Sequence, residues 1–308
     1  MDINQENINL FLNKYVSFVN EISERMQYNN NIKHLLYIIV PAFVAKYGIN
    51  NEQTVLNCFR NTKVYIREHN KNVSAAFNRS LRKEGSKYYT DKFITVNSFS
   101  KSSLSTIIDN IVHEFNHAIN SINNEIIVTD DLIKVRTGLT TLNYDKEKIV
   151  FLNKSNETVL EEILNTTQTE EVIEVIKSFS SYYIENSELA NSLFSLKKEL
   201  GHKKYSSDAY SYHKKICTIL MDNKTFTPTI NNLRFKGLIE DIPSLFDNVV
   251  GEEGSYVKLN ENLTELHNLI IKYSESKMFK TRYLKKIKIV SDDITRIIED
   301  YDKKCIFK

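Results

Sequence analysis

Apolar side chains recur at helical spacing near the start of the chain. They form one side of an expected helix, at Ile8, Phe11, Leu12, Tyr15, Val16, Phe18, Val19 and Ile22. A spacing of three or four residues places side chains on one helical face. The stretch from Asn70 to Gly85 is polar and basic, so we expect a loop or an irregular helix there. Residues 1–85 are therefore predicted to form a helical N-terminal region.

The pattern then changes to that of a strand followed by a long helix. Residues 88–96 are rich in aromatic and β-branched side chains with partial alternation, which predicts a strand. Ser98 and Ser100 are suitable N-caps for the next helix. Its apolar face is predicted to hold Leu104, Ile107, Ile108, Ile111, Val112, Phe115, Ala118 and Ile119.

Further strands and helices are expected toward the C-terminus. Residues 125–128 and 131–135 are predicted as short strands, with Gly138 closing the second, and residues 158–179 as another strong helix. Ser291-Asp292-Asp293 is expected to cap a last helix over residues 294–301. The predicted fold class is α+β and mainly helical. A core with a small sheet, residues 86–185, is flanked by helical regions 1–85 and 186–308.

The composition supports a mainly helical fold and excludes some classes of function. Only 7 Gly and 3 Pro are present, too few for many β-turns. A net charge of +2 gives no overall attraction to nucleic acid. The most apolar run, residues 35–45, is too short to span a membrane, and no signal peptide is evident. We therefore expect a soluble cytoplasmic protein with no membrane span and no nucleic-acid partner, and its three separated cysteines agree with a reducing compartment.

The motif with the clearest chemistry is His113-Glu114-Phe115-Asn116-His117. Two histidines four residues apart project from the same face of a helix. That spacing suits two imidazole nitrogens at about 2.1 Å from one Zn²⁺. Glu114 is rotated by about 100° from His113, so it can lie beside the metal and take a proton from the attacking water. The motif predicts a metal site on this helix.

A catalytic zinc also needs a third protein ligand. The next predicted helix supplies two acidic neighbours, Glu161 and Glu162, with Asn165 one turn further on. Both acids lie off its apolar face, so the helical pattern does not choose between them. Asp145, which follows a glycine turn, is a further candidate.

The chain at this point resembles the zincin metallopeptidases, which carry HExxH, and within them the gluzincin branch, in which a helical glutamate completes the site. The resemblance covers about residues 88–180 and implies a zincin-like catalytic core. It excludes the metzincin branch, because Asn120 and Asn123 stand where that branch has Gly and a third His. The branch with an aspartate ligand is disfavoured, because its Gly-Thr start is absent before Asp145.

The resemblance also implies a ligand set and a function. By the gluzincin pattern of an Asn-Glu pair before a small apolar residue, Glu162 is the third ligand and Glu161 replaces the Asn. The alternative frame uses Glu161 with Asn165. We therefore expect a zinc metallopeptidase that acts on a peptide or protein substrate. It would hold one Zn²⁺ per chain on His113, His117 and Glu162, with Glu114 as the general base. The alternative is a non-catalytic zincin-like binding or regulatory module, and the oligomeric state is left open.

Weaker signals lie elsewhere in the chain. Packing is the ordinary role of tyrosine and histidine side chains. The candidate hydrogen-bond donors to a developing oxyanion are Tyr182, Tyr183, His202, Tyr210, Tyr212 and His213. His34, His69 and His267 are isolated in sequence, and are expected to be structural or surface residues. Residues 134–138 are expected to form an ordinary solvent-facing strand, with an edge strand for substrate pairing as the alternative. The basic cluster of Lys277, Lys280, Arg282, Lys285, Lys286 and Lys288, with Phe279 and Tyr283 interleaved, is expected to be a solvated helix face, with an anionic partner as the alternative.

Overall fold

The computed structural model describes residues 5–68, 74–98, 103–179, 210–276 and 278–305. The chain divides into two compact units. Unit 1 comprises residues 1–119 and 168–205, and unit 2 comprises residues 120–167 and 206–308. The predicted boundary near residue 185 lies outside the described residues, as do the predicted candidates Tyr182, Tyr183 and His202. Both units are mainly helical, and each contains one small sheet, which agrees with the predicted α+β class.

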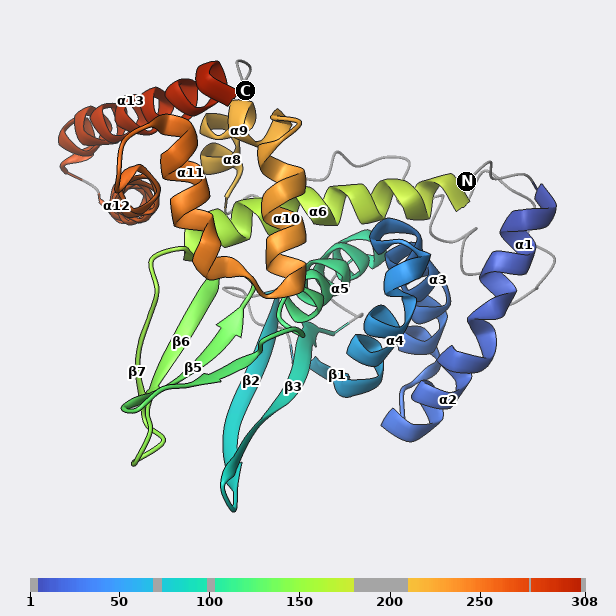
Figure 1. The fold of residues 1–308 in the computed structure, drawn as a ribbon. Coiled ribbons are helices and arrows are strands. Elements are labelled where there is room, and N and C mark those ends of the chain that lie inside the picture. Colours follow the sequence, from blue (N-terminus) through green and yellow to red (C-terminus); the bar gives the residue numbers. More distant parts are fainter. Residues whose placement is uncertain (1–4, 69–73, 99–102, 180–209, 277, 306–308) are drawn as a thin grey trace. The chain divides into compact units, whose positions relative to one another are not determined.

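The first segment of unit 1 begins with helices and ends with the helix that carries the histidines (Figure 1). Its helices are α1 (Gln5–Lys14), α2 (Val16–Met26), α3 (Asn30–Tyr47), the short 3-10 helix η1 (Ile49–Asn51), α4 (Glu52–Asn61) and α5 (Leu104–Ile119). Its strands are β1 (Thr62–Arg67), β2 (Ala75–Glu84) and β3 (Lys87–Asn97). The sheet order is β1-β3-β2, with β1 parallel and β2 antiparallel to β3.

The core of unit 1 fixes α5 through aromatic packing. Phe115 of α5 lies with its ring centroid 4.2 Å from Phe59 of α4 and 6.3 Å from Phe43 of α3. All three side chains are about 1% exposed or less. Because these rings come from three helices, they hold α5 at a defined position and rotation.

The β2–β3 hairpin corrects one prediction. Residues 70–85 were expected to form a loop or irregular helix, yet β2 pairs with β3 over ten positions, from Ala75 opposite Val96 to Glu84 opposite Lys87. Its side chains are partly buried or exposed and do not alternate between apolar and polar, so no strand pattern is visible in the sequence. Cross-strand hydrogen bonding decides the structure here. The predicted boundary at residue 85 falls at the turn of this hairpin, at Gly85.

Unit 2 combines an antiparallel sheet with a helical bundle. Its strands are β4 (Ile126–Val128), β5 (Leu132–Thr137), β6 (Thr140–Asp145) and β7 (Phe151–Lys154), which pair in chain order. Its helices are α8 (Ser211–Ile216), α9 (Thr218–Asp222), α10 (Phe226–Lys236), η2 (Ile239–Asp241), α11 (Ile242–Val250), α12 (Ser255–Glu275) and α13 (Lys280–Cys305). The alternative of an edge strand at residues 134–138 is wrong, because β5 lies between β4 and β6.

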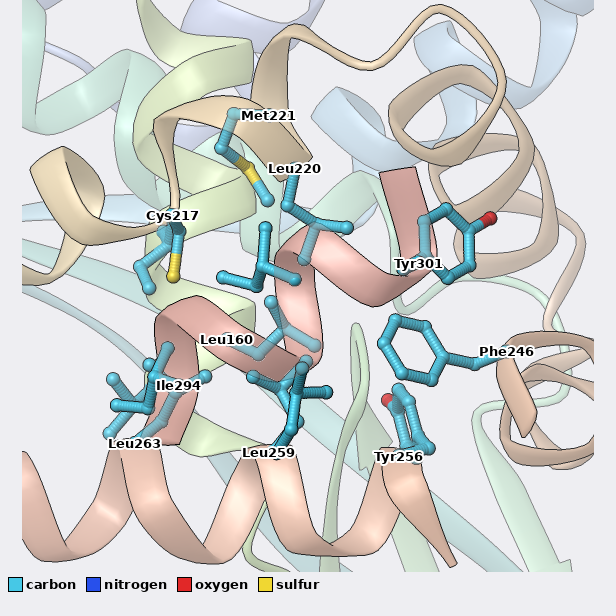
Figure 2. Packing of buried hydrophobic residues seen from close by; sticks show 14 of the residues in the cluster. Leu160, Cys217, Leu220, Met221, Phe246, Tyr256, Leu259, Leu263, Ile294 and Tyr301 are labelled. Atoms are coloured by element: carbon cyan, nitrogen blue, oxygen red, sulfur yellow. The ribbon is translucent and has the colours of Figure 1, made fainter. Parts of the chain in front are cut away.

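Helix α6 (Thr158–Phe179) belongs to both units, because its residues up to Thr167 pack in unit 2 and those from Gln168 pack in unit 1. Its bounds are those predicted. In unit 2, Leu160 is fully buried in the core formed with α9 and α11–α13 (Figure 2). Within that core, Phe246 and Tyr301 stack with ring centroids 4.7 Å apart. The first turns of α6 are thus anchored in the core of unit 2.

The predicted cap at Ser291-Asp292-Asp293 is also wrong, because α13 runs without a break from Lys280 to Cys305. Ile287 and Val290, before the expected cap, are buried in the same core as Ile294. The Ser291 hydroxyl donates to the carbonyl oxygen of Ile287 within the helix, which accommodates a polar residue in its interior.

Among the described residues, no single helix is long and apolar enough to cross a membrane. Helix α3 and the segment Ile49–Asn61 reach that length and apolarity only when taken together, with a bend of 112° between them.

Candidate metal centre

Helix α5 presents His113 and His117 side by side. Their ring centroids are 5.0 Å apart and the rings are nearly perpendicular, at 82°. His117 is buried and His113 is partly buried. The predicted spacing therefore places both imidazoles together on one face of a regular helix.

The two residues between Glu114 and His117 hold the helix in place. Phe115 belongs to the aromatic core of unit 1. Asn116 is fully buried, and its amide oxygen accepts a hydrogen bond from the hydroxyl of Tyr47 at 3.2 Å. Its amide nitrogen donates to the hydroxyl oxygen of Thr169 on α6, at 3.1 Å. Asn116 thus links α5 to both α3 and α6.

Glu162 is carried by the same helix as the Thr169 partner of Asn116. Glu162 lies on the same continuous helix as Thr169, seven residues earlier, which is about two helical turns. Residues seven apart share a helical face. Glu162 therefore lies on the same side of α6 as Thr169.

The ligand atoms of His113, His117 and Glu162 all lie within 4.8 Å of one another. A tetrahedral zinc with ligands at about 2.1 Å requires ligand atoms about 3.4 Å apart, a separation inside that bound. Two imidazoles and one carboxylate also match the donor set of catalytic zinc sites. This group could hold a metal ion.

Glu161, the alternative ligand, is occupied elsewhere. Its side chain is 1% exposed, and its two oxygens accept hydrogen bonds from the guanidinium of Arg234 at 2.6 and 3.0 Å. The backbone N–H of Leu139 donates to the same carboxylate at 2.7 Å. Gly138 lies against this carboxylate, so that a Cβ there would come within 2.1 Å of Oε1. Glu161 thus forms a buried ion pair within unit 2.

A second buried arginine holds the turn that receives Glu161. Arg136 donates to the carbonyl oxygens of Gly138 at 2.9 Å and Arg234 at 3.0 Å, and it also donates to that of Asn123. Burial lowers the pKa of Arg136 to about 10, while the negative charge of Glu161 opposes that shift. These bonds fix the β5–β6 turn, and through Glu161 they fix the first turns of α6.

The third candidate, Asp145, is not part of the described group. One of its carboxylate oxygens accepts the backbone N–H groups of Glu147 at 3.0 Å and Lys148 at 2.7 Å. It therefore caps the turn between β6 and β7.

Glu114 is positioned by the neighbouring sheet. Its side chain is 8% exposed, and its Oε2 accepts a hydrogen bond of 2.6 Å from the backbone N–H of Phe77 on β2. This bond fixes the orientation of the carboxylate and ties it to the outer strand of the β1-β3-β2 sheet. Glu114 is absent from the metal-competent group, as its predicted rotation away from the histidines implies.

Unit 2 gathers three aromatic polar side chains, and the charge of Glu162 acts on two of them, Tyr210 and His267. The rings of Tyr210 and His267 stack at 5.3 Å, and His213 lies 5.7 and 5.3 Å from them. Burial raises the pKa of Tyr210 to about 12, with the nearby charge of Glu162 adding to the shift. Burial and then the charge of Lys154 lower the pKa of His267, which Glu162 opposes.

His213 is the most enclosed member of this cluster. It is fully buried, and neither ring nitrogen has a hydrogen-bond partner among the described residues. Burial, together with His267, lowers its pKa to about 4, so the ring is neutral at neutral pH. His267 was expected to be isolated, and in the sequence it lies 54 residues after His213. The two rings meet because α12, which carries His267, packs against α8, which carries His213.

No known family model matches this chain, and neither the curated proteins nor the solved structures include a significant match.

Proposed function

We propose that this chain is a zinc-dependent metallopeptidase of gluzincin type that holds one Zn²⁺ on His113, His117 and Glu162. The observation that carries the proposal is the convergence of these three donors, with the Glu114 carboxylate on the adjacent helical position. Glu161 is engaged by Arg234, which supports Glu162 as the third ligand. When bound, zinc would lower the pKa of a water molecule and polarise the scissile carbonyl.

The roles of the protein groups follow from their environment. Glu114 accepts the proton of the attacking water and delivers it to the leaving amine nitrogen. The Phe77 N–H orients this carboxylate. Tyr210 carries a hydroxyl whose pKa is raised to about 12, so it stays protonated at neutral pH and is a suitable donor to a developing oxyanion.

Strand β2 is the proposed docking edge for substrate, in place of residues 134–138. It lies at the edge of its sheet among the described strands, and Phe77 donates away from β3 toward Glu114. An extended peptide that pairs with this edge would run past the general base. The proposed substrate class is therefore a peptide or an extended protein segment.

The decisive experiment compares Glu114→Gln with wild type in metal content and in cleavage of a peptide library. Removal of the general base is expected to lower the cleavage rate by a factor of about 10² to 10⁴, while zinc stays near one per chain because the ligands are untouched. Glu174→Gln, a carboxylate-to-amide change at an exposed position of α6, is the matched control and should cleave like wild type. Cleavage by Glu114→Gln at the wild-type rate would refute the mechanism.

The second candidate is a non-catalytic zincin-like module that binds zinc and a partner. A protein with stoichiometric zinc and no chelator-sensitive cleavage of any library peptide would favour it. The burial and orientation of Glu114 beside the histidines favour catalysis, because a purely structural metal site does not require a general base.

A further inference from the structure

The first half of α13 and the turn before it carry an exposed surface that the proposed zinc site does not use. We call it the basic–apolar face, and it consists of Met278, Phe279, Lys280, Arg282, Leu284, Lys285, Lys288 and Ile289. Figure 1 shows α13 in red, with its inner side toward the helices of unit 2. On that inner side, Ile287 and Val290 are buried in the core. The basic–apolar face is therefore the outer side of a helix that is already packed.

Large apolar side chains on this face are strongly exposed. Met278 is 85% exposed, Ile289 62%, Phe279 58% and Leu284 49%. Single exposed apolar residues are common on protein surfaces. Four within twelve residues, at the tip and along one side of a helix whose core face is satisfied, indicate a surface that contacts an apolar phase.

The same twelve residues hold only positive charge. Residues 278–289 contain Lys280, Arg282, Lys285, Lys286 and Lys288 and no Asp or Glu. Lys286 lines a groove with Glu261 and Glu265 of α12, so we leave it out of the face. The nearest acidic residues along the chain are Glu275 before the turn and Asp292 after the face. The chain as a whole carries only +2, so this charge is local.

We propose that the basic–apolar face docks on an anionic phospholipid surface. Helices that lie in a membrane interface combine Lys and Arg with exposed large apolar side chains, which enter the boundary between headgroups and acyl chains. Each Lys or Arg near an anionic surface adds attraction, and the apolar tip at Met278 and Phe279 adds burial. A nucleic acid would use the basic residues but would leave Met278, Leu284 and Ile289 without an apolar partner. This surface is independent of the zinc site.

The experiment measures binding of the full chain to vesicles of phosphatidylcholine with and without phosphatidylserine. Wild type is expected to bind only the vesicles with phosphatidylserine, and to be released by high salt, since the Debye length falls from about 10 Å at 0.1 M to about 3 Å at 1 M. The double variant Lys285→Glu with Lys288→Glu should bind at least about 30-fold more weakly. Met278→Ser with Phe279→Ser should weaken binding about tenfold or more.

A matched control separates this face from general charge effects. Lys148→Glu with Lys215→Glu makes the same change in net charge at two exposed sites of unit 2, and it should bind like wild type. Thermal unfolding of all variants should match wild type, because the changed side chains are exposed. Equal binding to both kinds of vesicle, or equal losses in the control and in the α13 charge variant, would overturn the proposal. The proposal would also be overturned if the Met278/Phe279 variant bound vesicles as well as wild type and wild type bound single-stranded RNA tightly.

Discussion

Helix α5 and the first turns of α6 supply ligands to the same candidate centre, but they are held by different forces. The α5 segment is fixed by apolar packing of Phe115 and by the buried amide of Asn116. The α6 segment is fixed by a buried ion pair, in which Arg234, 73 residues later, holds Glu161. Apolar packing tolerates modest change, whereas a buried charge that loses its partner is left without compensation. Substitutions in the two segments should therefore lower the free energy of unfolding by different amounts.

The largest expected effect separates the two acidic neighbours. Glu161→Gln leaves the Arg234 guanidinium buried without its counter-charge, so the free energy of unfolding should fall by about 3–5 kcal/mol. Glu162→Gln should change that free energy by less than about 1 kcal/mol, because this side chain is only partly buried, and it should remove stoichiometric zinc. Denaturant unfolding of the metal-free proteins and elemental analysis measure both. The opposite pattern would assign the ligand role to Glu161.

A pH titration tests the polar cluster beside α6. The pKa of His213 is about 4 in the folded chain and about 6.5 in the unfolded chain, so only the unfolded state takes up a proton between these values. Stability from the neutral ring is complete above about pH 6.5 and falls as the pH drops toward 4, by at most about 3 kcal/mol. His213→Phe should flatten this part of the unfolding profile. A parallel profile in the variant would show that other groups cause the acid sensitivity.

Two glycines with similar backbone angles test how much the packing of Glu161 against its turn contributes to stability. Gly138 and Gly85 have similar left-handed φ angles of 57° and 60°, but a Cβ would meet Glu161 only at Gly138 and would meet nothing within 4 Å at Gly85. Gly85→Ala should cost about 1 kcal/mol of backbone strain. Gly138→Ala should cost about 2–3 kcal/mol, because it also displaces a buried, hydrogen-bonded carboxylate. Equal losses in thermal or denaturant unfolding would mean that the Glu161 packing contributes nothing.

The smallest effect concerns the amide that joins α5 to α6. Asn116→Ala removes two hydrogen bonds and should lower the free energy of unfolding by about 1–2 kcal/mol. Because it also releases α6, we expect zinc affinity to fall about tenfold or more. Asn260→Ala, which removes a buried amide that donates to Tyr256 in the core of unit 2, is the control. It should lower stability similarly and leave zinc affinity unchanged, as a competition titration with a chelator would show.

Local pattern was sufficient wherever a residue's role depends on its own helix. The apolar spacing predicted α6 with its observed bounds and predicted the apolar face of α5, although α5 begins at Leu104, after the caps expected at Ser98 or Ser100. The four-residue spacing of His113 and His117 brought the two rings together, because helical geometry alone decides which side chains share a face. The strand at residues 87–97 was equally visible from its aromatic and β-branched side chains.

Only the tertiary structure decided the features that depend on distant parts of the chain. Glu161 and Glu162 are equivalent in local pattern, and the difference between them arises from Arg234 and from the Leu139 N–H. Strand β2 has no apolar alternation and exists through its pairing with β3. His267 meets His213 and Tyr210 only because α8 packs on α12. Sequence pattern records the period of a single element, whereas ion pairs, strand pairing and helix packing depend on partners whose positions follow from the folded chain.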